Sequence, residues 1–254
     1  MNRLLILLML LACPLLAAGE EPAPAPADSV ESTWDDDEDL SDDDEFLYEE
    51  DDEVFISDPL EPLNRGIFWF NDKLYFYLVK PVARGYRWAV PEPWRISVQN
   101  AFLNLATPIR FVNAGLQGKF GDAGNELTRF VVNTTIGIGG FFDTAKDHFD
   151  IRKKDEDTGQ TLGYWGVGTG WYLVLPVFGP SNARDAVGLF ADSRLDLLYY
   201  IAEGRTYWGL VAYNKVNDLS IDKDTYEGIK KDALDPYLFV RDAFVQYRRN
   251  KIAN

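Results

Sequence analysis

The amino-acid sequence predicts an all-α body of roughly seven to nine helices, given the usual helix length. Proline-based helix-start signals recur along the chain, and apolar residues follow them at three- and four-residue steps. Strand-like alternation with hairpin turns is nearly absent. With 254 residues, the chain is long enough for one or two domains. We expect one folded domain over residues 57–250.

The first helix start lies at Asp58-Pro59-Leu60-Glu61. We expect Asp58 to be the N-cap, Pro59 the first helical residue and Glu61 the partner of a capping box. Lys80-Pro81 predicts a break or kink further along. The apolar stripe behind this start consists of Leu60, Leu63, Ile67, Phe70, Leu74, Tyr77 and Leu78.

Later helix starts are predicted at Pro93, Thr107-Pro108, Ser181 and Asp235-Pro236. Ser181 is expected to be an N-cap residue and not a nucleophile, because the second glycine of a nucleophile elbow is missing. The last helix is predicted to end in a basic turn, which favours the helix dipole.

The N-terminus is typical of an exported protein. Arg3 precedes an unbroken apolar run, and small residues follow at a plausible cleavage point, which predicts a signal peptide over residues 1–18. Leu10-Leu11-Ala12-Cys13 resembles a bacterial lipobox, so a lipoprotein signal over residues 1–12 with lipidation of Cys13 is the alternative.

Residues 19–56 are predicted to be a disordered, acidic, Pro/Ala-rich tether. Residues 28–53 hold 16 acids and no base, and like charges at this density repel. Calcium binding is less favoured because the run lacks the ligand spacing and turn glycine of an EF-hand loop.

The remaining residues, 54–254, are close to neutral, with 24 bases and 23 acids. This balance argues against a nucleic-acid partner, which requires a basic excess. A single cysteine and the single His148 exclude a disulfide framework, a cysteine-based zinc cluster and any site with two histidines. No nucleophile–base pair, metal site or cofactor loop can be assembled, so we expect neither an enzyme nor a cofactor.

Aromatic residues make up 14% of the chain, and clusters such as Phe68-Trp69-Phe70 place rings on several faces of one helical region. Tyrosine and tryptophan suit the bilayer boundary. The body has no apolar run long enough to span a bilayer. Helices lying in a membrane interface are therefore one interpretation, and a tightly packed aromatic core is the other.

Several motifs together resemble the MlaA (VacJ) family. They cover roughly residues 57–248 in family order and include Asp58-Pro59-Leu60-Glu61-Pro62-Leu63-Asn64-Arg65, Leu116-Gln117-Gly118, Gly139-Gly140-Phe141-Phe142-Asp143, Gly159-Gln160-Thr161-Leu162-Gly163-Tyr164-Trp165-Gly166-Val167-Gly168 and Tyr172-Leu173-Val174-Leu175-Pro176. The long acidic tether and Trp171 depart from the family pattern.

The resemblance implies a single ring-like, donut-shaped helical domain in the inner leaflet of a Gram-negative outer membrane, on the periplasmic side. It implies removal of mislocalised phospholipid from the outer leaflet through an amphipathic channel, which maintains lipid asymmetry. The implied partners are phospholipid, the outer-membrane bilayer, a trimeric porin and a periplasmic lipid carrier.

Passive conduction makes and breaks no covalent bond. A polar channel lining is sufficient, because it removes the free-energy cost of moving a head group through hydrocarbon. Asn64, Arg65 and Asn71 are candidates for lining this channel or for locking helices of the ring together. Phe141 and Phe142, after a glycine hinge, are candidates for a membrane-facing tip. A structural porin-associated module without lipid conduction, and a lipid-modifying enzyme, are the alternatives.

Overall fold

The structure is a computed structural model that describes residues 56–222 and 224–253. The signal peptide, Cys13 and the acidic tether lie outside the described residues, apart from Ile56 at the end of the tether range. The described part is mainly helical and contains one two-stranded antiparallel sheet.

In the first half of this part every regular element is a helix. Its elements are α2 (Glu61–Leu74), the π-helix η1 (Tyr75–Val79), α3 (Lys80–Ala89), α4 (Glu92–Leu105), α5 (Thr107–Leu116), α6 (Phe120–Thr135), α7 (Thr144–Phe149) and α8 (Thr158–Tyr164). The second half contains β1 (Tyr172–Leu175), β2 (Gly179–Asn182), α9 (Ala183–Leu195), α10 (Leu197–Ile201), α11 (Arg205–Ile221), α12 (Thr225–Asp232) and α13 (Pro236–Ala253). The helical body is confirmed, but it is divided into more helices than expected because α7, α8 and α10 are very short.

Two local predictions were wrong. Asp58 does not cap α2, since the helix begins at Glu61 without a side-chain cap, and the Asp58 carboxylate instead accepts hydrogen bonds from Asn64 and Tyr237. Ser181 lies in β2, and Asn182 caps α9 by accepting from the Asp185 N–H at 2.8 Å.

Of the break or kink predicted at Lys80-Pro81, the break does not occur. The helical backbone is continuous there, because the π-helical turn η1 joins α2 directly to α3. Both a proline and a π-helical turn are recognised causes of a kink in a helix.

The hairpin of β1 and β2 was not predicted. Tyr172 pairs with Asn182 and Leu175 with Gly179. Tyr172 and Val174 face inward and pack with Tyr237 of α13 in a small apolar core. The hairpin thus joins α2 on one side to α13 on the other.

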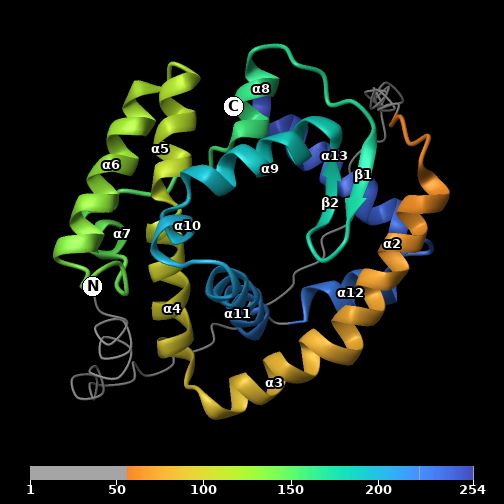
Figure 1. Cartoon of the computed structure of the whole chain (residues 1–254), viewed down its shortest axis with the longest axis horizontal. Coiled ribbons are helices and arrows are strands. Elements are labelled where there is room, and N and C mark those ends of the chain that lie inside the picture. The colour runs from red at the N-terminus through yellow and green to blue at the C-terminus, as the bar shows by residue number, and fades with distance from the viewer. Residues whose placement is uncertain (1–55, 223, 254) are drawn as a thin grey trace, which may run out of the picture. The chain divides into compact units, whose positions relative to one another are not determined.

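Within residues 56–253, the elements follow one another around a central opening (Figure 1). The long segment α2–η1–α3 forms one side, and α4 with α5 forms the opposite side. The hairpin, α9 and α10 lie along the inner edge, and α11 is seen end-on beside the opening (Figure 1).

The distribution of polarity is inverted relative to a water-soluble fold. Among the described residues, twenty-one polar or charged side chains are buried against nine apolar ones, and five of those nine are alanine. The largest fully buried side chains are Glu126, Asn64, Asn113, Asn217 and Ser220. Soluble proteins instead bury mainly large apolar residues.

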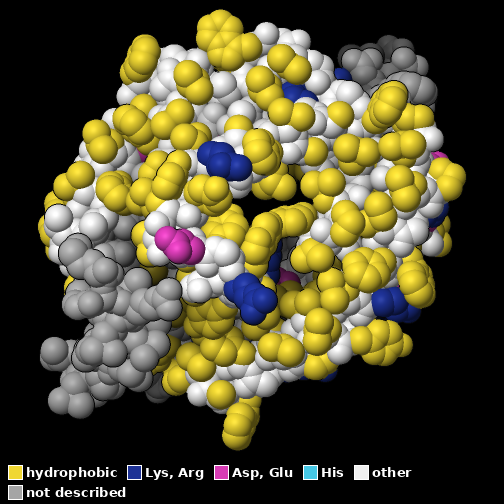
Figure 2. All heavy atoms as spheres, viewed as in Figure 1, with side chains coloured by type: hydrophobic (Ala, Val, Ile, Leu, Met, Phe, Trp, Pro, Cys, Tyr) yellow, Lys and Arg dark blue, Asp and Glu magenta, His cyan; other side chains and the backbone are white. Residues whose placement is uncertain are grey.

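The outer surface is correspondingly apolar. Thirty-five large hydrophobic side chains are exposed in the described part of the chain, among them Trp88 at 90% and Tyr77 at 77%. Figure 2 shows apolar side chains over most of the visible face, with only a few charged ones between them. Patches of this extent mark a surface that contacts a partner or a membrane.

Candidate functional site

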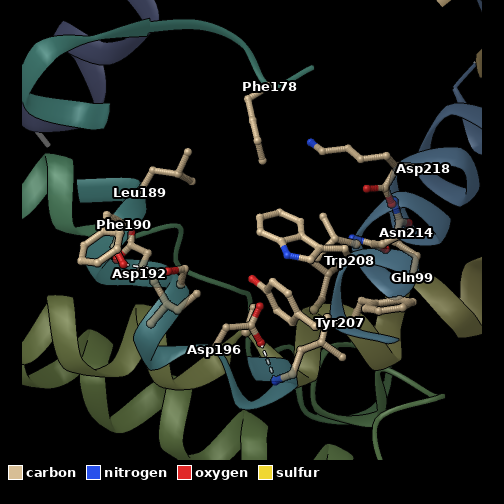
Figure 3. Close-up of a pocket in the computed structure, with 18 of the residues that line it drawn as sticks. Gln99, Phe178, Leu189, Phe190, Asp192, Asp196, Tyr207, Trp208, Asn214 and Asp218 are labelled. Atoms are coloured by element: carbon tan, nitrogen blue, oxygen red, sulfur yellow. Dashed lines mark hydrogen bonds between the residues drawn. The ribbon is translucent and has the colours of Figure 1, made fainter. Parts of the chain in front are cut away.

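A cavity of about 510 Å³ lies between α4, the hairpin, α9, α10 and α11. Figure 2 shows the corresponding hollow near the middle of the visible face, surrounded by apolar side chains. In the close-up, Phe178 from the hairpin turn and Trp208 from α11 point toward each other across the cavity (Figure 3). Most other lining residues are apolar, including Phe102, Leu103, Ala106, Ile109, Ala186, Leu189, Phe190, Leu198 and Val211.

Three carboxylates interrupt this apolar lining. Asp192 accepts hydrogen bonds from the Thr158 N–H at 3.1 Å and the Asn113 amide at 3.2 Å. Asp196 accepts from the Leu198 N–H at 2.8 Å and Asp218 from the Gln99 amide at 3.1 Å. The lining therefore combines apolar walls with fixed negative charge.

Burial raises the pKa of the Asp192, Asp196 and Asp218 carboxyls above the ordinary aspartate value. Hydrogen bonds from Thr158, Leu198 and Gln99 oppose this rise but do not cancel it. Each carboxylate is partly buried in the cavity wall, and removal from water disfavours its charged form.

Asn64, a predicted site residue, joins α2 to the hairpin. Its amide nitrogen donates to the Tyr172 carbonyl at 3.0 Å and to Asp58 Oδ1 at 2.8 Å, and its Oδ1 accepts from the Val174 N–H at 2.9 Å. The side chain is 1% exposed. The two bonds to Tyr172 and Val174 connect segments more than 100 residues apart, whereas the bond to Asp58 is local.

Asn71 repeats this arrangement two helical turns later on α2. Its amide nitrogen donates to the Leu175 carbonyl at 3.0 Å, and its Oδ1 accepts from the Val177 N–H at 2.8 Å. Asn64 and Asn71 thus hold both ends of β1 against α2.

Arg65, the third predicted residue, contacts the start of α13. It donates to Glu61 at 2.7 Å and pairs with Asp235 at 3.0 Å, and its guanidinium lies 4.5 Å from the centre of the Tyr237 ring. These contacts connect the two ends of the described chain. None of Asn64, Arg65 and Asn71 is among the residues that line the cavity.

Charged side chains attach α12 to the inner side of α2 and η1. Asp72 accepts from Lys230 at 2.6 Å and from the Tyr226 hydroxyl at 3.0 Å. Glu227 accepts from the Tyr75 hydroxyl at 2.9 Å and pairs with Lys80. Polar contacts therefore hold α12 beside α2, η1 and the start of α3.

Buried ion pairs connect α5, α6 and the N-cap of α7. Arg110 donates to the fully buried Glu126 at 2.7 Å. Arg129 makes two hydrogen bonds to Asp143, at 2.8 and 2.9 Å, and Asn133 donates to the same carboxylate. Hydrogen bonds from Arg129 and Asn133 hold the pKa of Asp143 below its usual value, although burial alone would raise it.

The predicted tip follows α6. Phe142 is 46% exposed and Phe141 is half-buried. The preceding glycine segment is a tight turn, since a Cβ on Gly140 would lie 2.5 Å from Asn104 Cβ and φ is 93° there. Only glycine fits such a position without strain.

Sequence reasoning missed the cavity residues Asp192, Asp196, Asp218 and Trp208. No local signal marks them, because they come from α9, from the N-cap of α10 and from α11 and meet only in the folded ring. Among the described residues, no group of three or more histidine, cysteine or acidic side chains could hold a metal ion. Nor is any helix of the described part sufficiently long and apolar to cross a bilayer.

A family model described as MlaA lipoprotein matches residues 56–251, which is nearly the whole described part. The chain belongs to the MlaA lipoprotein family. This confirms the resemblance found in the sequence motifs.

Individual members of the family support the assignment. The chain is 37% identical over 203 residues to the intermembrane phospholipid transport system lipoprotein MlaA of Escherichia coli, covering 78% of this chain and 79% of that protein. An uncharacterized protein of Rickettsia bellii is 31% identical over 251 residues, which span 98% of this chain and 93% of the relative.

One solved structure of a family member has the same fold. It comes from work on the structural basis for maintenance of bacterial outer membrane lipid asymmetry, and it matches with a TM-score of 0.69 at 33% identity. The match covers 77% of this chain and 99% of the solved one.

Proposed function

We propose that this chain is the outer-membrane component of an intermembrane phospholipid transport system and conducts phospholipid through the opening of its ring. The single observation that carries the proposal is the inverted polarity: charged and amide side chains are buried, and large apolar side chains cover the outside. Such a molecule is stable where its outer surface contacts lipid tails. The names of the family members given above supply the cargo.

The cavity provides the route. A phospholipid resists leaving its leaflet because the head group would be stranded in hydrocarbon without hydrogen-bond partners. Carboxylates, amides and one lysine in the cavity wall offer such partners, while the acyl chains remain against apolar surface. No bond is made or broken in this passage, so no catalytic group is needed.

Asn64, Arg65 and Asn71 have a locking role in this proposal. The contacts of Asn64 and Asn71 to the β1 backbone and of Arg65 to Asp235 support locking over lining. They keep α2, the hairpin and α13 together so that the opening has a fixed outline.

Phe141 and Phe142 form the membrane-facing tip. Replacing both with aspartate is expected to weaken partitioning into detergent micelles and flotation with vesicles, because two charges would enter the interface. Converting the exposed Gln246 of α13 to glutamate gives the control for added charge. Unchanged partitioning of the double variant would refute the tip assignment.

In this proposal the protein lies in the inner leaflet of the outer membrane. It reaches that location after cleavage at residue 18 or after lipidation of Cys13. Mass spectrometry of the mature N-terminus distinguishes these two routes. A trimeric porin beside the ring and a periplasmic lipid carrier below it complete the proposed pathway, and residues 19–56 act as the tether.

The test is the lipid composition of the outer leaflet. Deleting the gene in the producing cell is expected to place phospholipid in the outer leaflet, and the native chain restores asymmetry. A structural porin-associated module without conduction predicts an unchanged outer leaflet on deletion. A lipid-modifying enzyme predicts that purified protein converts phospholipid to new products.

A further inference from the structure

The charge of the cavity wall bears on which head group it accepts. Three carboxylates, Asp192, Asp196 and Asp218, line the cavity together with one cation, Lys215. The summed formal charge of these four side chains is therefore negative. This lies inside a near-neutral body, so the excess of acid is local to the cavity.

Aromatic rings face the same space. Trp208 is 61% exposed and projects into the cavity, and Tyr207 lies beside it with ring centres 5.2 Å apart (Figure 3). Tyr207 also lies close enough to Asp196 for that carboxylate to help raise the pKa of the Tyr207 hydroxyl, after the larger effect of burial. Ring faces next to carboxylates are the two elements that bind organic ammonium groups.

Asn214 is a separate indication of a missing donor. It lines the cavity, and its Oδ1 is buried with no hydrogen-bond partner in the described part of the chain. An amide oxygen in this situation is costly unless a donor reaches it.

From this juxtaposition we infer that the cavity prefers phospholipids whose head group carries a primary ammonium, of the phosphoethanolamine class, over anionic head groups without an amine. The inference rests on the proposed function. The ammonium lies between the carboxylates and the rings, and Lys215 pairs with the phosphate that both lipid classes share. The ammonium places a positive charge beside the partly buried carboxylates, which are poorly hydrated in the cavity wall.

The expected magnitude follows from the charges. One unit charge about 6 Å from the ammonium, screened as in water, changes affinity about three-fold. Three acids against one base then favour the amine-bearing lipid about ten-fold over an anionic lipid of the same acyl chains.

The test uses the full-length protein purified in mild detergent and mixed with micelles that contain equal amounts of phosphatidylethanolamine and phosphatidylglycerol with identical acyl chains. The protein is repurified and the retained lipids are counted by mass spectrometry. The native chain is expected to enrich phosphatidylethanolamine about ten-fold. D218N lowers this ratio about three-fold, and K215Q raises it about three-fold.

Two variants of opposite sign keep the test independent of folding, since damage to the ring would move both ratios in the same direction. The control for charge is Asp232→Asn, an exposed acid of α12 outside the cavity, which leaves the ratio unchanged. Equal retention of both lipids overturns this inference but leaves the proposed passage intact. Retention of neither lipid overturns the passage as well.

Discussion

Replacing Asn64 with aspartate tests how the ring is closed. The two side chains have the same shape, but aspartate turns the donating nitrogen into a second acceptor. That atom then faces the Tyr172 carbonyl at 3.0 Å and Asp58 Oδ1 at 2.8 Å. The bond from the Val174 N–H to Oδ1 is retained.

The cost can be worked from these contacts. Two buried acceptors lose their donor, and each loss costs about 1–3 kcal/mol. The expected decrease in the free energy of unfolding is therefore about 4 kcal/mol near neutral pH. For a folded part of this size, that lowers the midpoint of thermal unfolding by about 8–16 °C.

The dependence on pH has a definite sign. The Asp58 carboxylate raises the pKa of the new carboxyl in the folded state, so the penalty is present at neutral pH and is relieved as the pH falls through that raised value. Protonation restores one donor. Thermal unfolding followed by circular dichroism in detergent, at pH 7 and pH 5, measures both effects.

The control is Gln246→Glu, the same amide-to-acid change at an exposed position of α13, which is expected to leave the midpoint nearly unchanged. The reasoning fails if the Asn64 variant melts with the native chain at pH 7, or if acid does not narrow the difference between them.

Three further predictions concern the buried network and the glycine turn. R110M leaves the fully buried Glu126 without its cation. The expected decrease in the free energy of unfolding, measured by denaturant titration, is about 3–5 kcal/mol. Adding E126Q should recover part of that loss, and a double variant whose loss equals the sum of the two single losses would show that Arg110 and Glu126 are not coupled. Hydrogen bonds from Arg248 hold the pKa of Asp157 below its usual value, although burial raises it. This pair therefore stabilises the fold above about pH 4, and the stabilisation is lost as the pH falls further. The difference in unfolding free energy between D157N and the native chain should shrink only in that acid range, and a difference that does not change with pH would show that Asp157 does not titrate in this way. G140A places a Cβ 2.5 Å from the Asn104 side chain at a φ of 93° and should lower the melting midpoint, whereas an unshifted midpoint would show that the turn can relax.

The sequence predicted the helices that local signals define. Asp235-Pro236 marks the start of α13, where Asp235 Oδ1 accepts from the Tyr237 N–H at 2.9 Å. The same reasoning was wrong at Asp58, because the buried Asn64 amide and the Tyr237 hydroxyl compete for that carboxylate. A cap is a local interaction, and tertiary hydrogen bonds override it.

The hairpin could not be predicted for a related reason. Its second strand contains Gly179 and Pro180, which are poor strand residues. The strand β1 is fixed from outside by amides of α2. The hydrophobic periodicity of residues 172–182 carries no sign of these contacts with α2.

The candidate site was predicted only in part. Asn64 and Arg65 were selected from the Asp58–Arg65 motif of the family resemblance and Asn71 from the Phe70-Asn71 match that follows it, with lining and locking both left open. The cavity carboxylates were missed since Asp192 and Asp218 look like ordinary helix-surface acids along the chain. Their common environment is a property of the closed ring.

Passage of whole lipids through the opening can be tested by filling the cavity. The double variant A106W/A186W places two indole rings in its wall, and A243W on the exposed face of α13 is the matched control. The measurement is phospholipid in the outer leaflet of cells that carry each variant in place of the native chain. We expect that the filled ring still associates with membranes yet leaves phospholipid in the outer leaflet, as in the deletion, whereas the control variant removes that phospholipid. If the filled ring removes phospholipid from the outer leaflet as well as the native chain does, whole lipids do not pass through the opening.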